Sequence, residues 1–327
     1  MQDGESDHDL QAEWDAVELR TDKAREEAAR NVGVIKAKED EASTPINLQD
    51  VRQWISQLVV DPEVLRPLRE QKVVDASCCG ARERSRLDVP KLSRKHQAGK
   101  DLLIFLHLSS FDFNVTTHFR MLRTIYKKLT RNQVCPSIGH HWEVIGFQNT
   151  DPRMDLNRSG GVLNVVHLFF FCSKHFELLR SIHVLSIDDQ QHFPLACVSV
   201  NLSQMVYDAI FTGRLSGLFT RTDASFLETA CSIHSACLYY YYDRYRARKG
   251  TVLDNEATLK EVNAILVGRP SKLLDMFEAA ARKPGHGDAG QLEFTDLELG
   301  TKKTTQATNG QNGSVPDRLK GYASPET

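Results

Sequence analysis

The densest pattern in the chain runs from His140 to Cys172 and reads HHWEVIGFQNTDPRMDLNRSGGVLNVVHLFFFC. Aromatic residues and a glycine precede an Asp-Pro pair, which is typical of the start of a helix. A single arginine then precedes a Gly-Gly pair and a long apolar run. The positions that give the stretch this form are Trp142, Gly146, Phe147, Asp151, Pro152, Gly160 and Gly161. We expect a loop with a fixed entry that leads into a buried helix.

Arg158 has a charge that is unexpected at its position in this loop. It lies just before the predicted helix 162–172, where the helix dipole disfavours a cation. Ser159, Gly160 and Gly161 leave the backbone open to close approach, so Arg158 and free N–H groups together suit an anion such as phosphate. Two simpler interpretations stay open: an awkward helix-to-helix turn, and a local ion pair between Asp155 and Arg158 at i, i+3 spacing.

Composition narrows the class of protein. The chain has 327 residues, of which 41% are hydrophobic and 26% charged, as in soluble globular proteins. Its net charge of −2 provides no overall basic field for nucleic acid. Seven cysteines, an odd number, favour reduced thiols in the cytosol. The apolar run 162–172 is too short for the roughly 20 residues of a membrane span.

Apolar spacing predicts an all-α fold. Stripes at helical intervals indicate helices over residues 51–59, 115–129, 176–185 and 202–210. Asp223 is expected to cap a long helix with buried positions from Phe226 to Tyr241, and Ser271 to cap the last helix. The run LLIFLHL from Leu102 has no assignable period.

We expect four regions along the chain. Residues 1–47 form a charged tail that is disordered or partly helical, and residues 48–100 hold short amphipathic helices and a linker. Within the latter, 76–100 is interpreted as a long loop. A single helical domain covers 101–282, and 283–327 is a disordered tail.

Neither a metal site nor an autonomous enzyme is indicated. Cys231, His234 and Cys237 are spaced at i, i+3 and i+6, and a helix rises about 9 Å over that span. Bonds of about 2.0–2.3 Å cannot gather all three around one zinc ion, so these are interpreted as buried core residues. No nucleophile motif or phosphate-binding glycine loop is present in the sequence.

Three segments together resemble a known family. HWEVIGFQNTDPRMDL, residues His141–Leu156, is similar to the signature W-E-x-I-G-F-Q-x-x-D-P-x-x-D-L of the ELMO domain. LRTIYKKLT (Leu122–Thr130) and FPLACVSVNLSQMVYDAI (Phe193–Ile210) are similar to the same family. The resemblance covers about Thr116 to Ala281 and is strongest to the stand-alone ELMO domain proteins.

The resemblance implies an all-α domain that activates GTP hydrolysis by Arf- and Arl-family GTPases. The family's proposed catalytic residue is the arginine after D-L, which implies a role in trans for Arg158. It implies no cofactor of the chain's own, since GTP and Mg²⁺ belong to the partner. The expected location is the cytoplasm, with peripheral association with endomembranes or the cilium. Residues expected to orient the loop or contact the partner are Gln148, Asp151, Asp155 and Asn157.

Two registers are open at the expected catalytic position. The family reads D-L-R-G, whereas this chain reads Asp155-Leu156-Asn157-Arg158-Ser159-Gly160-Gly161. Without a gap, Asn157 replaces the arginine, and the chain is a non-catalytic module that binds a GTPase or a trafficking or cytoskeletal partner. With one inserted residue Arg158 aligns, and the apolar stripe of the following helix is restored.

Overall fold

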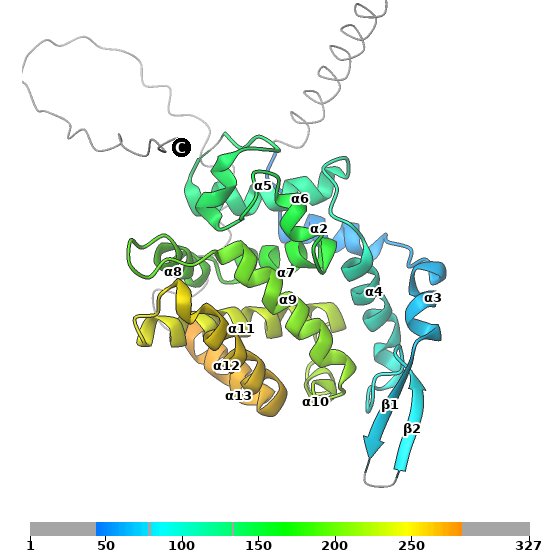
Figure 1. The fold of residues 1–327 in the computed structure, drawn as a ribbon. Coiled ribbons are helices and arrows are strands. Elements are labelled where there is room, and N and C mark those ends of the chain that lie inside the picture. Colours follow the sequence, from blue (N-terminus) through cyan, green and yellow to red (C-terminus); the bar gives the residue numbers. More distant parts are fainter. Residues whose placement is uncertain (1–43, 78–79, 133, 283–327) are drawn as a thin grey trace, which may run out of the picture. The chain divides into compact units, whose positions relative to one another are not determined.

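The structure is a computed structural model, and it describes residues 44–77, 80–132 and 134–282. Within these ranges the chain is mainly helical, as predicted, with one two-stranded antiparallel sheet (Figure 1). The predictions for the first 43 residues, for Cys78–Cys79 and for the tail from 283 lie outside the described residues.

The elements include short 3-10 helices between some of the longer helices. In chain order they are α2 (Leu48–Ser56), α3 (Pro62–Glu70), β1 (Lys72–Ser77), β2 (Gly80–Ser85), η1 (Arg94–His96), α4 (Gln97–Leu108), α5 (Thr116–Thr130), η2 (His140–Ile145), α6 (Pro152–Leu156), α7 (Gly161–Lys174), α8 (Phe176–Ser186), α9 (Leu195–Phe211), α10 (Ser216–Phe219), α11 (Phe226–Ala247), η3 (Val252–Asp254), α12 (Asn255–Gly268) and α13 (Pro270–Ala281).

Helix α7 is the centre of the domain. Every residue from Gly161 to Cys172 is buried, as expected for a helix that is apolar on all sides. It packs against α4, α5, α9 and α11, and α11 in turn packs against α12 and α13 (Figure 1). The loop singled out in the sequence is therefore anchored at one end to the most buried element of the fold.

Three of the four periodic segments form the predicted helices, whereas the helix predicted over 51–59 ends at Ser56 in α2 and leaves Val59 exposed. The stripe over 115–129 lies in α5, the stripe over 176–185 in α8, and the stripe over 202–210 in the C-terminal half of α9. The unassigned run from Leu102 belongs to α4. In each of these helices the apolar face contributes to one continuous core.

The prediction of a long loop over residues 76–100 is wrong. β1 and β2 pair in register from Lys72 opposite Ser85 to Ser77 opposite Gly80, and α4 begins at Gln97. β2 reads GARERS, which is charged and lacks the β-branched residues that mark a strand in sequence. Backbone pairing rather than an apolar stripe defines this hairpin.

Two predicted helix caps are also wrong. The long helix α11 begins at Phe226, and its cap is Ser225, whose hydroxyl accepts from the Glu228 amide at 3.2 Å. Asp223 lies two residues too early for this role. Helix α13 begins with Pro270, so Ser271 lies inside its first turn. Proline suits the first helical position because its missing N–H would have no partner there.

The segment that precedes α2 is docked on α5. The Ile46 amide donates to the Thr124 hydroxyl at 3.0 Å, and the Arg120 guanidinium donates to the carbonyls of Thr44 and Pro45 at 3.0 Å each. Ile46 and Val51 are buried in the same core as the central helices. Residues 44–56 thus contribute to the stability of the main domain.

No single described helix is both long and apolar enough to cross a bilayer. By length and composition alone, α7 and α8 together meet the requirement as a pair bent by 114° at the break between them.

Candidate functional site

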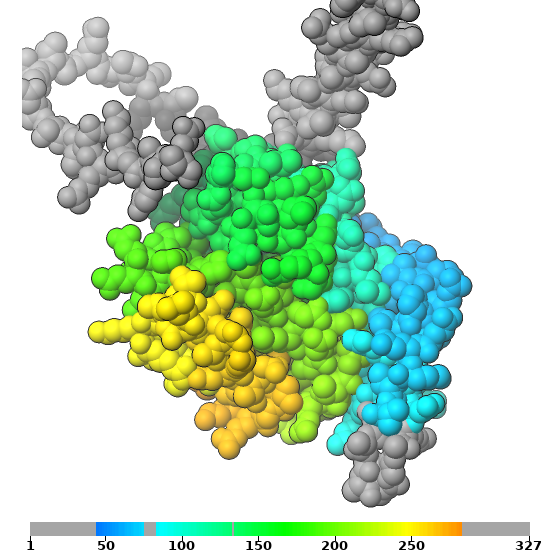
Figure 2. Space-filling model, viewed as in Figure 1, coloured from blue at the N-terminus to red at the C-terminus, as the bar shows by residue number. Residues whose placement is uncertain are grey.

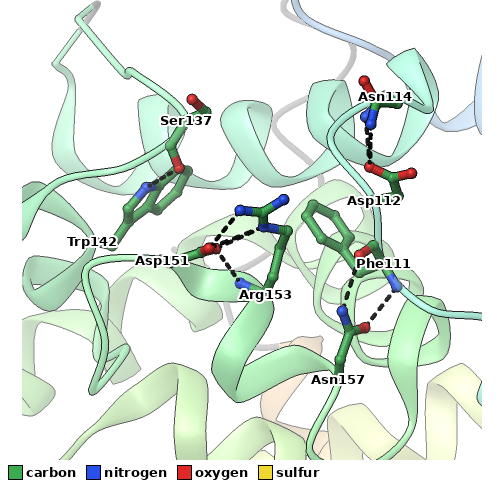
Figure 3. Close-up of polar contacts among 8 residues, drawn as sticks. All are labelled: Phe111, Asp112, Asn114, Ser137, Trp142, Asp151, Arg153 and Asn157. Atoms are coloured by element: carbon green, nitrogen blue, oxygen red, sulfur yellow. Dashed lines mark hydrogen bonds and ion pairs between the residues drawn. The ribbon is translucent and has the colours of Figure 1, made fainter.

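The loop from η2 to α7 is anchored at its start by buried aromatic residues. Trp142 is fully buried, and its indole N–H donates to the Ser137 carbonyl at 3.0 Å (Figure 3). Its ring lies edge-to-face against Tyr126 at 5.2 Å and Phe147 at 5.9 Å. Trp142 and Phe147 therefore hold the loop onto α5.

Gly146 lets the chain turn between these aromatic residues. Its φ is +88°, and a Cβ at this position would lie 2.2 Å from the backbone nitrogen of Leu195. Its carbonyl accepts from the Cys197 amide at 3.2 Å. Only glycine tolerates both this backbone conformation and this approach of α9.

Asp151 and Pro152 start α6 as predicted. The Asp151 carboxylate accepts from the Arg153 amide at 2.9 Å and pairs with the Arg153 guanidinium at 2.7 Å (Figure 3). Partial burial opposes ionisation of Asp151, but the hydrogen bonds and charge of Arg153 outweigh it and hold the pKa of this carboxyl below its ordinary value. The guanidinium also lies 4.7 Å above the Phe113 ring. Arg153 therefore has a structural role in this loop.

The buried Asp155 side chain stabilises the loop and forms no ion pair with the Arg158 side chain. Its carboxylate is buried and accepts from the backbone amides of Gln148 and Asn149 at 2.9 and 3.2 Å, and from the Asn149 side chain at 3.0 Å. The structural alternative of a local Asp155–Arg158 ion pair is therefore wrong. Gln148 is exposed, and Asp155 bonds to the Gln148 backbone and not to its side chain.

Asn157 is tied to the segment that follows α4. Its side-chain oxygen accepts from the Phe111 amide at 2.7 Å, and its side-chain nitrogen donates to the Phe111 carbonyl at 3.0 Å (Figure 3). These paired bonds copy the pattern between neighbouring strands and use both ends of the amide. Asn157 thus has a scaffold role.

Arg158 differs from Asn157 in its side-chain contacts and not in its exposure, since Asn157 is also exposed. The residue is exposed, and its guanidinium donates to the Asn201 side chain at 3.2 Å. Asn201 lies on α9, and the space-filling view shows the segments around residues 155 and 200 adjacent on one face (Figure 2). An arginine has five N–H donors, so this contact leaves most of them directed to solvent.

The expectation that the glycines open the backbone to a ligand is not what the structure shows. Gly160 and Gly161 have φ of +86° and +45°, and a Cβ on Gly161 would lie 2.0 Å from the Ser109 carbonyl. That carbonyl accepts from the Val162 amide at 2.9 Å, and the Leu163 amide donates to Gly160 at 3.0 Å. The close approach is thus made by the chain itself.

Phe111 was not indicated by the sequence. Cys197 and Asn201 lie in the family-like segment 193–210 but were not singled out there, because their contacts with the loop join residues far apart in the chain. Burial first, and then the Asp155 carboxylate, raise the pKa of the Cys197 thiol to about 11, although Arg158 opposes the shift. The Cys197 thiol is therefore neutral near pH 7 and a weak nucleophile. What the site offers chemically is a cation on a rigid loop.

The model of the ELMO/CED-12 family matches residues 102–265, which is about half of the chain. The chain therefore belongs to the ELMO/CED-12 family. It is 31% identical over 207 residues to ELMO domain-containing protein 3 of Mus musculus, an alignment that covers 62% of this chain and 54% of that protein.

Two further relatives show the same domain. Identity to ELMO domain-containing protein 3 of Homo sapiens is 30% over 206 residues, covering 62% of this chain and 54% of that protein. Identity to the ankyrin repeat and ELMO domain-containing protein D of Dictyostelium discoideum is 26% over 94 residues, which cover 29% of this chain and 7% of that protein. The chain spans about half the length of the mammalian relatives. No solved structure matches the chain.

Proposed function

We propose that this chain is a GTPase-activating protein for an Arf- or Arl-family GTPase and that Arg158 acts in trans on the bound GTP. The observation that carries the proposal is the contrast between Arg158 and its surroundings. Among the described residues the exposed Arg158 side chain makes one hydrogen bond, to Asn201, whereas the side chains of Asp155 and Asn157 are bonded to the backbone of the scaffold. A cation on a fixed loop reaches a partner's phosphate at low entropic cost.

The contacts of Asn157 support the register in which Arg158 takes the place of the family's arginine. Both polar atoms of the Asn157 side chain are bonded to Phe111, so this side chain is directed into the scaffold. Arg158 is the next residue and faces solvent. An inserted residue at this point therefore leaves an arginine available to a partner.

Arg158 would act by electrostatic stabilisation of the transition state. Negative charge spreads over the transferred phosphoryl group in the transition state, and a guanidinium that hydrogen-bonds to it lowers the barrier. The hydrogen bond to Asn201 holds Arg158 in the free protein and is exchanged for phosphate oxygens in the complex. GTP and Mg²⁺ are supplied by the GTPase. Met154, whose surface is 65% exposed, provides an apolar contact four residues before Arg158.

Single-turnover GTP hydrolysis tests this proposal. A panel of Arf and Arl GTPases is loaded with GTP and mixed with wild-type chain or with Arg158→Ala. We expect acceleration of at least one GTPase by the wild type, and loss of about 10³-fold or more of that acceleration in the variant. Retention of the acceleration by Arg158→Ala would place the catalytic group elsewhere.

A second candidate function is a non-catalytic module that binds the GTPase or a trafficking or cytoskeletal partner. The observation that favours it is the residue directly after Leu156, which is Asn157 and not arginine. GTP-dependent binding without acceleration, unchanged in Arg158→Ala, is the result expected of such a module. The proposed location is the cytoplasm, with peripheral association with endomembranes or the cilium, which imaging of the tagged chain tests.

A further inference from the structure

A second basic site lies where the hairpin meets the C-terminal end of α9 (Figure 1). An open pocket of about 500 Å³ is formed there. Its lining includes three arginines, one aspartate and three apolar residues. The residues that line it are Val73, Arg84, Arg86, Asp208, Phe211, Thr212, Arg214 and Val267. The pocket volume is in the range of small-molecule sites.

Compensation of the helix dipole explains only one of the three arginines. The C-terminal end of α9 carries partial negative charge, and the Arg84 guanidinium donates to the Phe211 carbonyl at 3.1 Å and to the Asp88 carbonyl at 2.7 Å. Arg86 instead donates to the Gln71 side chain at 3.2 Å and lies 5.5 Å above the Phe211 ring. Two guanidiniums are therefore gathered here without a structural need for their charge.

Arg214 has the greatest freedom to bind a ligand. It is exposed, and among the described residues its side chain makes no hydrogen bond or ion pair. Arg86 forms no ion pair with a described carboxylate either, and its one side-chain hydrogen bond leaves most of its donors available. Arg86 is positioned by Gln71 and Phe211, while Arg214 can close over a bound group.

We propose that this pocket binds a phosphomonoester. Arg86 and Arg214 lie beside one carboxylate, Asp208, and two guanidiniums with available N–H donors suit a phosphomonoester, which carries about −1.5 to −2 at pH 7. Its oxygens accept the forked N–H donors of Arg86 and Arg214. Val73, Phe211 and Val267 provide an apolar wall for the organic part of the ligand. The source is either a soluble phosphate ester or the headgroup of a membrane lipid.

Titration calorimetry with the full chain tests the proposal, with glycerol 3-phosphate as the soluble probe. We expect saturable binding that Arg214→Glu weakens by about ten-fold or more, since a charge-assisted hydrogen bond is lost and a repulsive charge is added. Arg94→Glu is the matched control, because Arg94 is also an exposed arginine and lies outside the pocket. Unchanged affinity in Arg214→Glu, or an equal loss in Arg94→Glu, would overturn the proposal.

A second variant protects the result against loss of folding. Arg86→Gln removes the second guanidinium of the proposed site and keeps a side chain with N–H donors beside Gln71. Thermal unfolding of each variant shows whether the fold is intact, and affinity that falls in both with an unchanged unfolding temperature supports the site. Absence of any binding by the folded wild type in both this titration and the vesicle assay overturns it.

Vesicles distinguish the two sources. Phosphatidylcholine vesicles containing phosphatidic acid, a phosphomonoester, are compared with vesicles containing phosphatidylserine, a phosphodiester. Retention by phosphatidic acid that depends on Arg214 identifies a lipid ligand, whereas binding of glycerol 3-phosphate alone identifies a soluble one. Equal, Arg214-independent retention by both vesicles, together with no soluble binding, contradicts the proposal. The Arg158→Ala variant is expected to bind as the wild type does, so this site and the proposed GTPase activation are tested independently.

Discussion

Asp155 determines the conformation of the candidate loop at the scale of single residues. It is buried, and three donors from Gln148 and Asn149 converge on its carboxylate. Because its partners lie on the same loop, Asp155 sets the path of the chain between η2 and α6. Arg158, three residues later, gains a defined position from this arrangement, and its backbone amide donates to the Asp155 backbone carbonyl at 3.4 Å.

Asp155→Ala is expected to lower the free energy of unfolding by about 3 kcal/mol, since three donors lose their charged acceptor. It should also reduce any acceleration of GTP hydrolysis, because Arg158 loses its fixed base. Chemical denaturation measures the first effect. Asp155→Asn keeps one acceptor oxygen and should fall between wild type and alanine. A change within about 0.5 kcal/mol for Asp155→Ala would contradict this role.

Gly161→Ala is expected to destabilise the protein by about 1–3 kcal/mol, since its Cβ would lie 2.0 Å from the Ser109 carbonyl at a φ of +45°. Gly217→Ala is the matched control: a Cβ there meets nothing within 4 Å and lies in a helix. We expect the control to be neutral or slightly stabilising in thermal unfolding. Equal effects of the two substitutions would show that the loop rearranges freely.

At the scale of elements, a pair of buried histidines joins α7 to α11 and α9. The rings of His167 and His234 are stacked with centroids 4.7 Å apart, and both are fully buried. They hydrogen-bond to Ser203 and Ser199 of α9 at 3.0 and 3.1 Å. His234 is the middle residue of the Cys-x-x-His-x-x-Cys run, whose three members are buried on α11. This confirms the interpretation of the run as core.

The histidine pair makes stability depend on pH. Burial lowers the pKa of His234 to about 4 and the pKa of His167 well below its ordinary value, with the neighbouring histidines adding repulsion at His167. Between about pH 6.5 and 4 the unfolded chain therefore binds more protons than the folded chain, so stability falls as the pH is lowered.

Because of His234, the free energy of unfolding is expected to fall by about 3 kcal/mol across that interval. His167 adds a further loss. Urea unfolding at a series of pH values measures it. His234→Gln should show a shallower decline, because one of the neutral buried imidazoles is gone. A free energy of unfolding that stays constant from pH 7 to 4 in the wild type would contradict this account.

At the scale of the whole molecule, the segment before the family domain is part of its core. Val51 of α2 is 2% exposed, whereas Val59, which follows the same helix, is 84% exposed. We expect Val51→Ala to cost about 2 kcal/mol in unfolding free energy and Val59→Ala almost nothing. Equal, small effects would mean that residues 44–56 are held only weakly against α5.

Periodicity predicted the interior of the fold well and its edges poorly. The helices with strong apolar stripes, such as α5, and the wholly apolar α7 were evident, because burial imposes a period on the sequence. The hairpin was missed because β2 is charged and is held by backbone pairing. The cap at Ser225 was misplaced by two residues, since several residues there are suitable caps.

The same limit applies to the candidate loop. Its aromatic anchors and the Asp-Pro helix start could be predicted from local sequence, because each depends on neighbours in the chain. The contacts of Asn157 with Phe111 and of Arg158 with Asn201 join residues 46 and 43 positions apart. No local motif reveals contacts of such long range, and they decide which side chain keeps its donors available to a partner.

The most direct measurement of the central claim is the single-turnover hydrolysis rate of a responsive Arf or Arl GTPase at saturating concentrations of this chain. Saturation separates catalysis from affinity. We expect the rate to fall to the intrinsic level with Arg158→Ala, to recover at most partly with Arg158→Lys, and to be unchanged with Arg180→Ala, whose exposed arginine lies on α8 and contacts Glu177. A saturated rate with Arg158→Ala equal to that of the wild type would contradict the claim that Arg158 acts on the bound GTP.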